Sequence, residues 1–300
     1  MFIVSAAILW ASGGTASKYL FNAGISPYVL VQYRVSFSSL IIFGYLFFFK
    51  RQSLKINSKD LWSLAILGVL GMGGVQVTYL FAISKIKVAM AILLQYLAPF
   101  FVAIYSYLFF RERMDRWKVL SILLAFIGCF FVVEAYRVSF FSLDKWGVIA
   151  GLFSAGFFSF YSLLGEGLMR KYDPWTVLLY AFVFGALFFN SILPLNNLLV
   201  WKTEFRIFIT VFYIVSFGTA IPFGFYFMGI EHLRATRATI VATLEPISAG
   251  ILSFFMLGEV FNWWQIFGGF LVIAAIIIIQ SRREVDPEAP IYKKKESRTV

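Results

Sequence analysis

The chain has 300 residues, of which 61% are hydrophobic, 20% are aromatic and only 14% are charged. An average soluble domain carries roughly 25% charged residues, and one of this size could not keep so much apolar surface out of water. A soluble globular enzyme, a disordered linker and a nucleic-acid-binding domain are therefore poorly supported, and the net charge of +11 fits membrane topology better than nucleic-acid binding.

Ten apolar segments follow one another along the chain, and each is long enough to cross a bilayer, which takes about 20 largely apolar helical residues. They predict an all-α polytopic membrane protein whose short loops leave no room for an extra soluble domain. The expected transmembrane helices are 2–22, 27–49, 61–82, 88–110, 117–135, 146–168, 175–194, 206–229, 235–257 and 263–281.

The two ends of the chain are predicted to differ. Met1 leads straight into the first apolar run with no basic region before it, so we expect a retained span rather than a cleaved signal peptide. Residues 282–300 are charged and contain Pro287 and Pro290, which indicates a flexible, solvated tail.

Lys and Arg are distributed unevenly between alternate loops. With the N-terminus in the cytoplasm, the cytoplasmic segments hold 18 of these residues and the outer loops hold 6. Because positive residues gather on the cytoplasmic side, we expect a multi-pass protein of the cytoplasmic (inner) membrane with both termini inside. Seven of the eight Trp residues lie at span ends or in a loop, as in an aromatic belt, and only Trp10 lies well inside a span.

The two halves of the chain match at a fixed spacing of 147 residues, and each half holds five spans. Because five is odd, the second half enters the membrane from the opposite side, which predicts two inverted five-helix repeats at 1–140 and 141–281, followed by the tail. Such repeats are typical of transporters that alternate access around a site between them, and a duplicated scaffold without transport is the alternative. The matching pairs are Pro27 with Pro174, Tyr33 with Tyr180, Gly71 with Gly218, Tyr79 with Tyr226, Pro99 with Pro246, Glu112 with Glu259 and Trp117 with Trp264.

The most specific motifs of the chain are Leu244-Glu245-Pro246 and Gly258-Glu259 in the second half. With the parallel segment of the first half, they resemble the EamA-type repeats of the drug/metabolite transporter (DMT) superfamily. The resemblance covers nearly the whole chain except the tail. It implies ten helices, a central cavity lined mainly by the first, third, fourth, sixth, eighth and ninth spans, no use of ATP, and export of amino acids or other small metabolites.

The first half departs from this pattern at two positions. Ala98 stands where an acid would precede Pro99, and Arg111 replaces the glycine before Glu112. The resemblance does not fix the substrate, because the family is broad.

Glu245 is the sharpest candidate for a substrate or coupling-ion site. It lies near the middle of the span 235–257, where a charge costs roughly 2.5–3.5 kcal/mol and should face protein or water. Pro246 lacks an N–H and should leave the carbonyl of Ala242 without its helical partner. A carboxylate beside a free carbonyl suits a proton, a cation or an ammonium group, and the alternative is tight helix packing with the acid satisfied by a neighbour.

Two basic residues are further candidates. Arg34 lies about two turns into the span 27–49, and Lys18 lies near the outer end of the first span. Either residue is suited to bind a substrate carboxylate or to balance the negative charge of Glu245. The alternatives are a structural hydrogen-bond anchor for Arg34 and snorkelling to the interface for Lys18.

Aromatic and amide side chains would complete a cavity with aromatic walls and a few polar groups, the usual composition of a small-molecule site. Any one of them can equally serve in packing or lipid contact, since aromatic residues are so frequent here. The neutral candidates are Trp10, Gln76, Tyr79, Gln95 and Tyr226.

Small residues and prolines indicate hinges or close helix packing. Static packing is the default interpretation for each of them. The positions are Gly14, Gly71, Pro99, Gly151, Pro222 and Pro246.

Other charged residues are expected to be structural. Glu166 precedes Arg170 by four residues and Glu134 precedes Arg137 by three, which predicts helix-surface pairs at the membrane interface. Glu112 and Glu259 end equivalent helices and are expected to tie helix ends to loops.

Several searches of the sequence find nothing. There is no Walker-type phosphate loop, no H-E-x-x-H or Cys/His cluster, no pair of intramembrane aspartates and no G-x-S-x-G turn. Cys129 is the only cysteine, which excludes an internal disulfide framework. We therefore expect no cofactor, no metal and no enzymatic activity.

These observations favour a secondary transporter that exports a small polar metabolite, best an amino acid, around a midplane cavity. The sequence is equally compatible with transport coupled to protons through Glu245 and with facilitated diffusion. The alternatives are uptake or exchange of another metabolite, such as a nucleotide derivative or a lipid-linked sugar, and a membrane scaffold or sensor without flux. Oligomeric state is not predicted.

Overall fold

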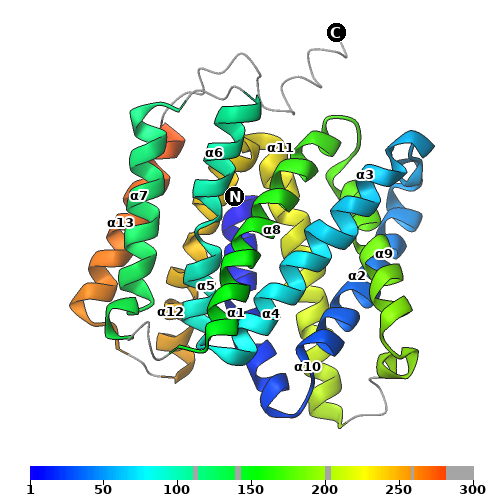
Figure 1. Cartoon of the computed structure of the whole chain (residues 1–300), viewed down its shortest axis with the longest axis horizontal. Coiled ribbons are helices and arrows are strands. Elements are labelled where there is room, and N and C mark those ends of the chain that lie inside the picture. Colours follow the sequence, from blue (N-terminus) through cyan, green and yellow to red (C-terminus); the bar gives the residue numbers. More distant parts are fainter. Residues whose placement is uncertain (111–113, 139–142, 200–203, 258–259, 282–300) are drawn as a thin grey trace.

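The computed structural model describes residues 1–110, 114–138, 143–199, 204–257 and 260–281, and within them it contains helices and turns but no strands (Figure 1). The expectations for Arg111, Glu112, Glu259 and the tail concern positions outside these residues. The helices are α1 (Phe2–Asn22), α2 (Pro27–Phe49), α3 (Leu61–Ile66), η3 (Leu67–Gly73), α4 (Gly74–Lys85), α5 (Val88–Gln95), α6 (Ala98–Phe110), α7 (Arg116–Val132), α8 (Lys145–Met169), α9 (Pro174–Ile192), α10 (Phe205–Val215), η8 (Ser216–Ala220), α11 (Ile221–Ala242), α12 (Leu244–Leu257) and α13 (Trp263–Ser281).

These elements join into ten rods in the described part of the chain. α3, η3 and α4 form one continuous rod, as do α5 and α6, and α10, η8 and the first arm of α11. α11 is interrupted at Arg234, whose φ of 69° and ψ of 162° are not helical, so its second arm turns back and continues into α12. In Figure 1 the turns around residues 55 and 172 lie at the upper end of the molecule, and those around 24 and 195 lie at the lower end.

Seven helical stretches of the described residues are long and apolar enough to cross a membrane, whereas the sequence predicts ten spans. The difference has local causes. α1 is rich in Gly, Ser and Thr, α7 has only 17 residues, and the stretch Phe205–Ala242 runs through the turn at Arg234 and so joins two predicted spans.

The helix starts show why the boundaries fall where they do. Ser26 and Asp173 are 147 residues apart, and each accepts a hydrogen bond from the backbone N–H two residues later, with a proline as the first helical residue. Such a cap contributes about 1 kcal/mol, and proline loses nothing at this position. Asp115 and Asn262, also 147 residues apart, cap α7 and α13 by accepting a hydrogen bond from the backbone N–H three residues later.

Helix interruptions recur at the same spacing. η3 and η8 are both π-helices, and they overlap when one is shifted by 147 residues. α5 ends at Gln95 and α11 ends at Ala242, again 147 residues apart. Pro99 and Pro246 follow these breaks, and each proline removes the N–H that would bond the carbonyl four residues earlier.

Close helix contacts organise the bundle. α7 packs along α13 at one side, α2 packs along α9 at the other, and α1, α4, α8 and α11 fill the middle (Figure 1). A side chain on Gly128 would lie only 2.7 Å from the carbonyl oxygen of Gly268, so these two glycines let α7 and α13 touch through their backbones. Gly13 packs on Gly218 in the same manner, which brings α1 against η8 at the centre of the molecule.

Candidate functional site

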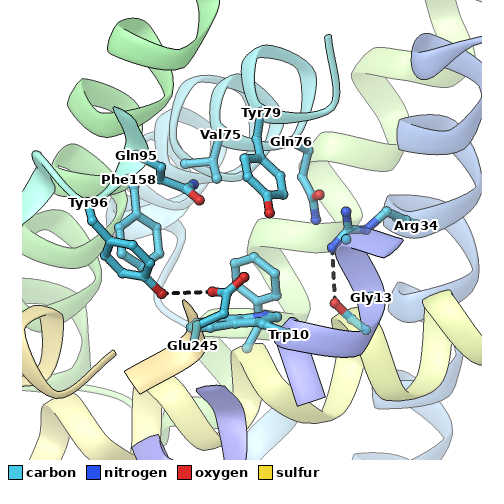
Figure 2. A pocket seen from close by; sticks show the side chains of 13 residues that line it. Trp10, Gly13, Arg34, Val75, Gln76, Tyr79, Gln95, Tyr96, Phe158 and Glu245 are labelled. Atoms are coloured by element: carbon cyan, nitrogen blue, oxygen red, sulfur yellow. Dashed lines mark hydrogen bonds between the residues drawn. The ribbon is translucent and has the colours of Figure 1, made fainter. Parts of the chain in front are cut away.

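A cavity lies at the centre of the bundle, between helices of both halves (Figure 2). It measures about 40 Å³ as space open to the centre of a water molecule, and one water needs about 10–15 Å³ on this measure. The cavity therefore has room for a few waters but not for a metabolite in this form of the molecule. The lining residues are Trp10, Gly13 and Gly14 from α1, Arg34 from α2, Val75, Gln76 and Tyr79 from α4, Gln95 and Tyr96 at the end of α5, Phe158 from α8, Gly218 from η8, Phe223 from α11 and Glu245 from α12.

Glu245 occupies one wall of the cavity and is only 5% exposed. It sits at the break between α11 and α12, where Pro246 leaves the carbonyl of Ala242 without a helical partner. The hydroxyl of Tyr96 replaces that partner, because its oxygen lies 2.6 Å from the Ala242 carbonyl oxygen. The same hydroxyl lies 2.7 Å from Oε2 of Glu245 (Figure 2).

Arg34 occupies the opposite wall and is 6% exposed. Its Nε donates to the hydroxyl of Thr219 at 2.7 Å, and its Nη2 donates to the carbonyl of Gly218 at 3.0 Å. Pro222 explains the second bond, since it cannot supply the N–H that Gly218 would receive in an α-helix. Arg34 thus anchors α2 to η8 and still presents a cation to the cavity.

Two polar atoms that face this site have no hydrogen-bond partner in the structure. They are Nε1 of Trp10 and the hydroxyl of Tyr79. A buried donor without a partner costs free energy, so these atoms are suited to bind a cargo or water. Gln76 makes only a long contact of 3.6 Å to the sulfur of Met72, which leaves its amide available as well.

Aromatic rings build the floor of the cavity. The ring of Trp10 meets those of Phe158 and Phe223 edge-on, with centroids 6.1 and 5.1 Å apart. Tyr226 lies behind these rings, where its hydroxyl forms a hydrogen bond with the hydroxyl of Ser162 at 2.7 Å. Tyr226 therefore supports the cavity without lining it.

Lys18 is not part of the cavity either. Its Nζ donates to the carbonyl of Ile83 at 2.7 Å, near the C-terminus of α4. The last carbonyls of a helix lack partners and attract cations, so Lys18 closes the end of α4.

The predicted hinge residues lie where helices are interrupted or closely packed. A side chain on Gly14 would meet Val88 at 3.2 Å, one on Gly71 would meet Tyr161 at 3.5 Å, and one on Gly151 would meet Leu94 at 2.6 Å. The prolines follow the helix interruptions, with Pro99 in α6, Pro222 as the second residue of α11 after η8, and Pro246 in α12.

A groove of about 510 Å³ at the lower end approaches the cavity from one side. Its walls include Ala11 and Thr15, which flank the cavity residue Gly14 along α1, and Pro246, which follows Glu245. Neighbouring residues of α1 and α12 therefore line the groove and the cavity.

A buried ion-pair network lies at the upper end. Glu166 is 3% exposed, and its carboxylate accepts from Nε of Arg234 at 3.2 Å and from the backbone N–H of Ala235 at 2.8 Å. The predicted pair with Arg170 is present at 3.7 Å, but Glu166 is buried in the protein rather than exposed. The positive φ of Arg234 costs about 1–3 kcal/mol, and this network holds the residue in place.

Sequence reasoning missed the extent of this network, and it did not place Phe158 in the cavity. Arg234 stands between two apolar runs, so it looks like an ordinary loop residue. Its one visible signal is the 147-residue spacing from Lys87, which directly precedes α5 as Arg234 precedes the second arm of α11. The pair of Glu134 and Arg137 is confirmed at 3.0 Å.

Comparison with known proteins agrees with this architecture. The model of the EamA-like transporter family matches residues 1–134 and 145–281. YicL of Salmonella typhimurium, an inner membrane transporter by name, is 29% identical over 290 residues, which cover 94% of this chain and 95% of the relative. A transporter of Archaeoglobus fulgidus is 27% identical over 279 residues, covering 92% and 94% of the two chains.

Two further similarities are more distant. A protein of Streptantibioticus cattleyicolor named "probable terminal-alkyne amino-acid exporter" is 25% identical over 226 residues, 75% of each chain. A solved crystal structure shares the fold with a TM-score of 0.75 and 17% identity, over 92% of this chain and 94% of the other. The family model matches nearly all of the chain outside its tail, and the chain therefore belongs to the EamA-like transporter family, as a membrane transporter of the DMT superfamily.

Proposed function

We propose that this protein exports amino acids or closely related small metabolites across the cytoplasmic membrane by alternating access. One observation carries the proposal. Arg34 and Glu245 face each other across a central cavity that has further unpartnered donors between them. A cargo with a carboxylate and an ammonium group matches these two walls, with the carboxylate toward Arg34 and the ammonium toward Glu245.

The two halves of the chain form inverted repeats in this proposal. The recurrence of the helix caps, the π-helices and the helix breaks at 147 residues supports it. Five rods per half reverse the direction of the second half. The cavity between the halves is then the fixed site, and the halves rock around it.

The upper end faces the cytoplasm in this orientation, because the Lys and Arg bias favours cytoplasmic termini. The network of Glu166 and Arg234 then closes the cytoplasmic side, and the lower-end groove faces outward. Cargo would enter when the network opens, and the cavity would have to widen from its present volume. The relative named as an amino-acid exporter supports export as the direction.

A phosphorylated cargo fits this cavity less well. Arg34 is the one Lys or Arg among the described residues that line it, and two of its donors are already engaged. A nucleotide or a phosphorylated sugar usually binds several basic groups or backbone N–H groups.

Efflux of amino acids from overproducing cells tests the proposal. We expect one amino acid or related metabolite to accumulate in the medium, and Glu245→Gln to slow its efflux about 10- to 100-fold, because a hydrogen bond to a charged group contributes about 1.5–3 kcal/mol. Glu204→Gln, the same change at an exposed residue just before α10, serves as the control with unchanged efflux. An unaltered medium, with the protein correctly inserted, would refute amino-acid export.

A further inference from the structure

The hydroxyl of Tyr96 lies between two oxygens contributed by the other half of the chain. It is 2.6 Å from the Ala242 carbonyl oxygen and 2.7 Å from Oε2 of Glu245. Both distances are those of O–H···O hydrogen bonds. A tyrosine hydroxyl has one hydrogen to donate and lone pairs that accept, so it can donate along only one of the two contacts.

The proton count distinguishes two states of Glu245. The Ala242 carbonyl can only accept. If Glu245 is ionised, Tyr96 has two acceptors and one hydrogen, and one close oxygen pair is left without a proton between them. If Glu245 is protonated, its O–H donates to Tyr96, and Tyr96 donates to Ala242, so every contact is a hydrogen bond.

We propose that Glu245 carries a proton in this narrow form of the cavity, and that Tyr96 transmits the presence of that proton to the break between α11 and α12. The chain of hydrogen bonds then runs from Glu245 through Tyr96 to Ala242, and it joins the break after α5 to the break after α11. Loss of the proton removes the link between Glu245 and Tyr96, so that Tyr96 then holds the break through Ala242 alone.

The surroundings of Glu245 agree with this proton. The titratable groups that face it are Arg34 from α2, Tyr79 from α4, Tyr96 after α5 and Cys129 from α7, whose thiol contacts the Thr243 carbonyl at 3.8 Å. Among the residues that the structure describes, no Lys, Arg or His forms an ion pair with Glu245. Burying an unpaired charge costs far more than burying a hydrogen-bonded neutral group.

The cavity also contains the groups that an ionised Glu245 would need. The Trp10 indole N–H and the Tyr79 hydroxyl are unpartnered. When the proton passes to water in the cavity, these donors and the ammonium group of a cargo can bind the carboxylate, while Tyr96 keeps its bond to Ala242. Glu245 then holds either a proton or a cargo cation, which makes the transport an exchange. Only this last step rests on the proposed function.

Infrared difference spectroscopy of the purified protein in lipid at neutral pH tests the proton without any cargo. The C=O stretch of a protonated carboxyl group should be present in the wild type and absent from Glu245→Gln. Tyr96→Phe should keep this band but shift it, because the acid loses its acceptor. Tyr226→Phe, which removes a buried hydroxyl bonded to Ser162 instead, should leave the band in place.

Identical spectra of the wild type and Glu245→Gln in this region would overturn the proposal. So would a band that Tyr96→Phe does not move, and this comparison with Tyr226→Phe remains decisive if Glu245→Gln fails to fold. The proposed function fails separately: a shifted band without amino-acid efflux refutes the cargo, and efflux without the band refutes the proton.

Discussion

The two halves of the chain have the same helix interruptions but different polar groups. Both halves contain a π-helix and a break followed by a proline at corresponding positions. The two charged groups of the cavity each occur in one half only. Ala181 and Ala98 stand where the other half has Arg34 and Glu245, and Thr243 corresponds to Tyr96.

This difference separates architecture from chemistry. The helix breaks and prolines that occur in both halves bend and pack the helices. The polar side chains that occur in one half carry charge or bond a backbone group that lacks its helical partner. Arg34 shows the second case, because it bonds the carbonyl that Pro222 leaves free, and the first half has Val75 in place of Pro222.

The largest expected effect comes from separating the two roles of Arg34. Arg34→Gln should lower stability by about 1–3 kcal/mol, because the buried Gly218 carbonyl loses a donor, and it should abolish transport. Adding Pro222→Val, the residue of the first half, should restore much of the stability by returning a backbone N–H, but no transport. Thermal unfolding in detergent and efflux assays measure the two quantities. If the losses of stability of the two single variants simply add in the double variant, Arg34 does not compensate for the N–H that Pro222 lacks.

A smaller effect is expected at the contact of α7 and α13. Gly128→Ala should cost about 1–3 kcal/mol, because its Cβ would lie 2.7 Å from the Gly268 carbonyl oxygen. Gly269→Ala, one residue along α13, has nothing within 4 Å and should be neutral or slightly stabilising. Melting temperatures of the two variants measure the contrast, and equal values would show that this contact is not tight.

Much of the fold could be predicted from the sequence, because it depends on local signals. Apolar length marks the spans, Pro27 and Pro174 mark helix starts, and Pro246 predicts the freed carbonyl of Ala242. The three spans that fall short of the apolar length differ for equally local reasons, such as the polar small residues of α1.

The partners of the polar groups could not be predicted. Tyr96 and Ala242 are 146 residues apart, and helices that are apolar all round give no sign of which face meets which neighbour. The same reason hid the carbonyl of Ile83 that Lys18 bonds and the pairing of Glu166 with Arg234. Only the packed structure shows which candidates share one cavity.

Alternating access to the central cavity is the core of this account, and cysteine accessibility tests it directly, since Cys129 is the chain's only cysteine and is buried. In a Cys129→Ser background, Val75→Cys in the cavity should react with a membrane-impermeant maleimide from either face of sealed vesicles, and cargo should slow the reaction. Ala249→Cys in the groove should react from the outer face alone. Leu40→Cys, at an exposed apolar position, is the control and should not react. A Val75→Cys variant that reacts from neither face, while Ala249→Cys reacts, would contradict transport through this cavity.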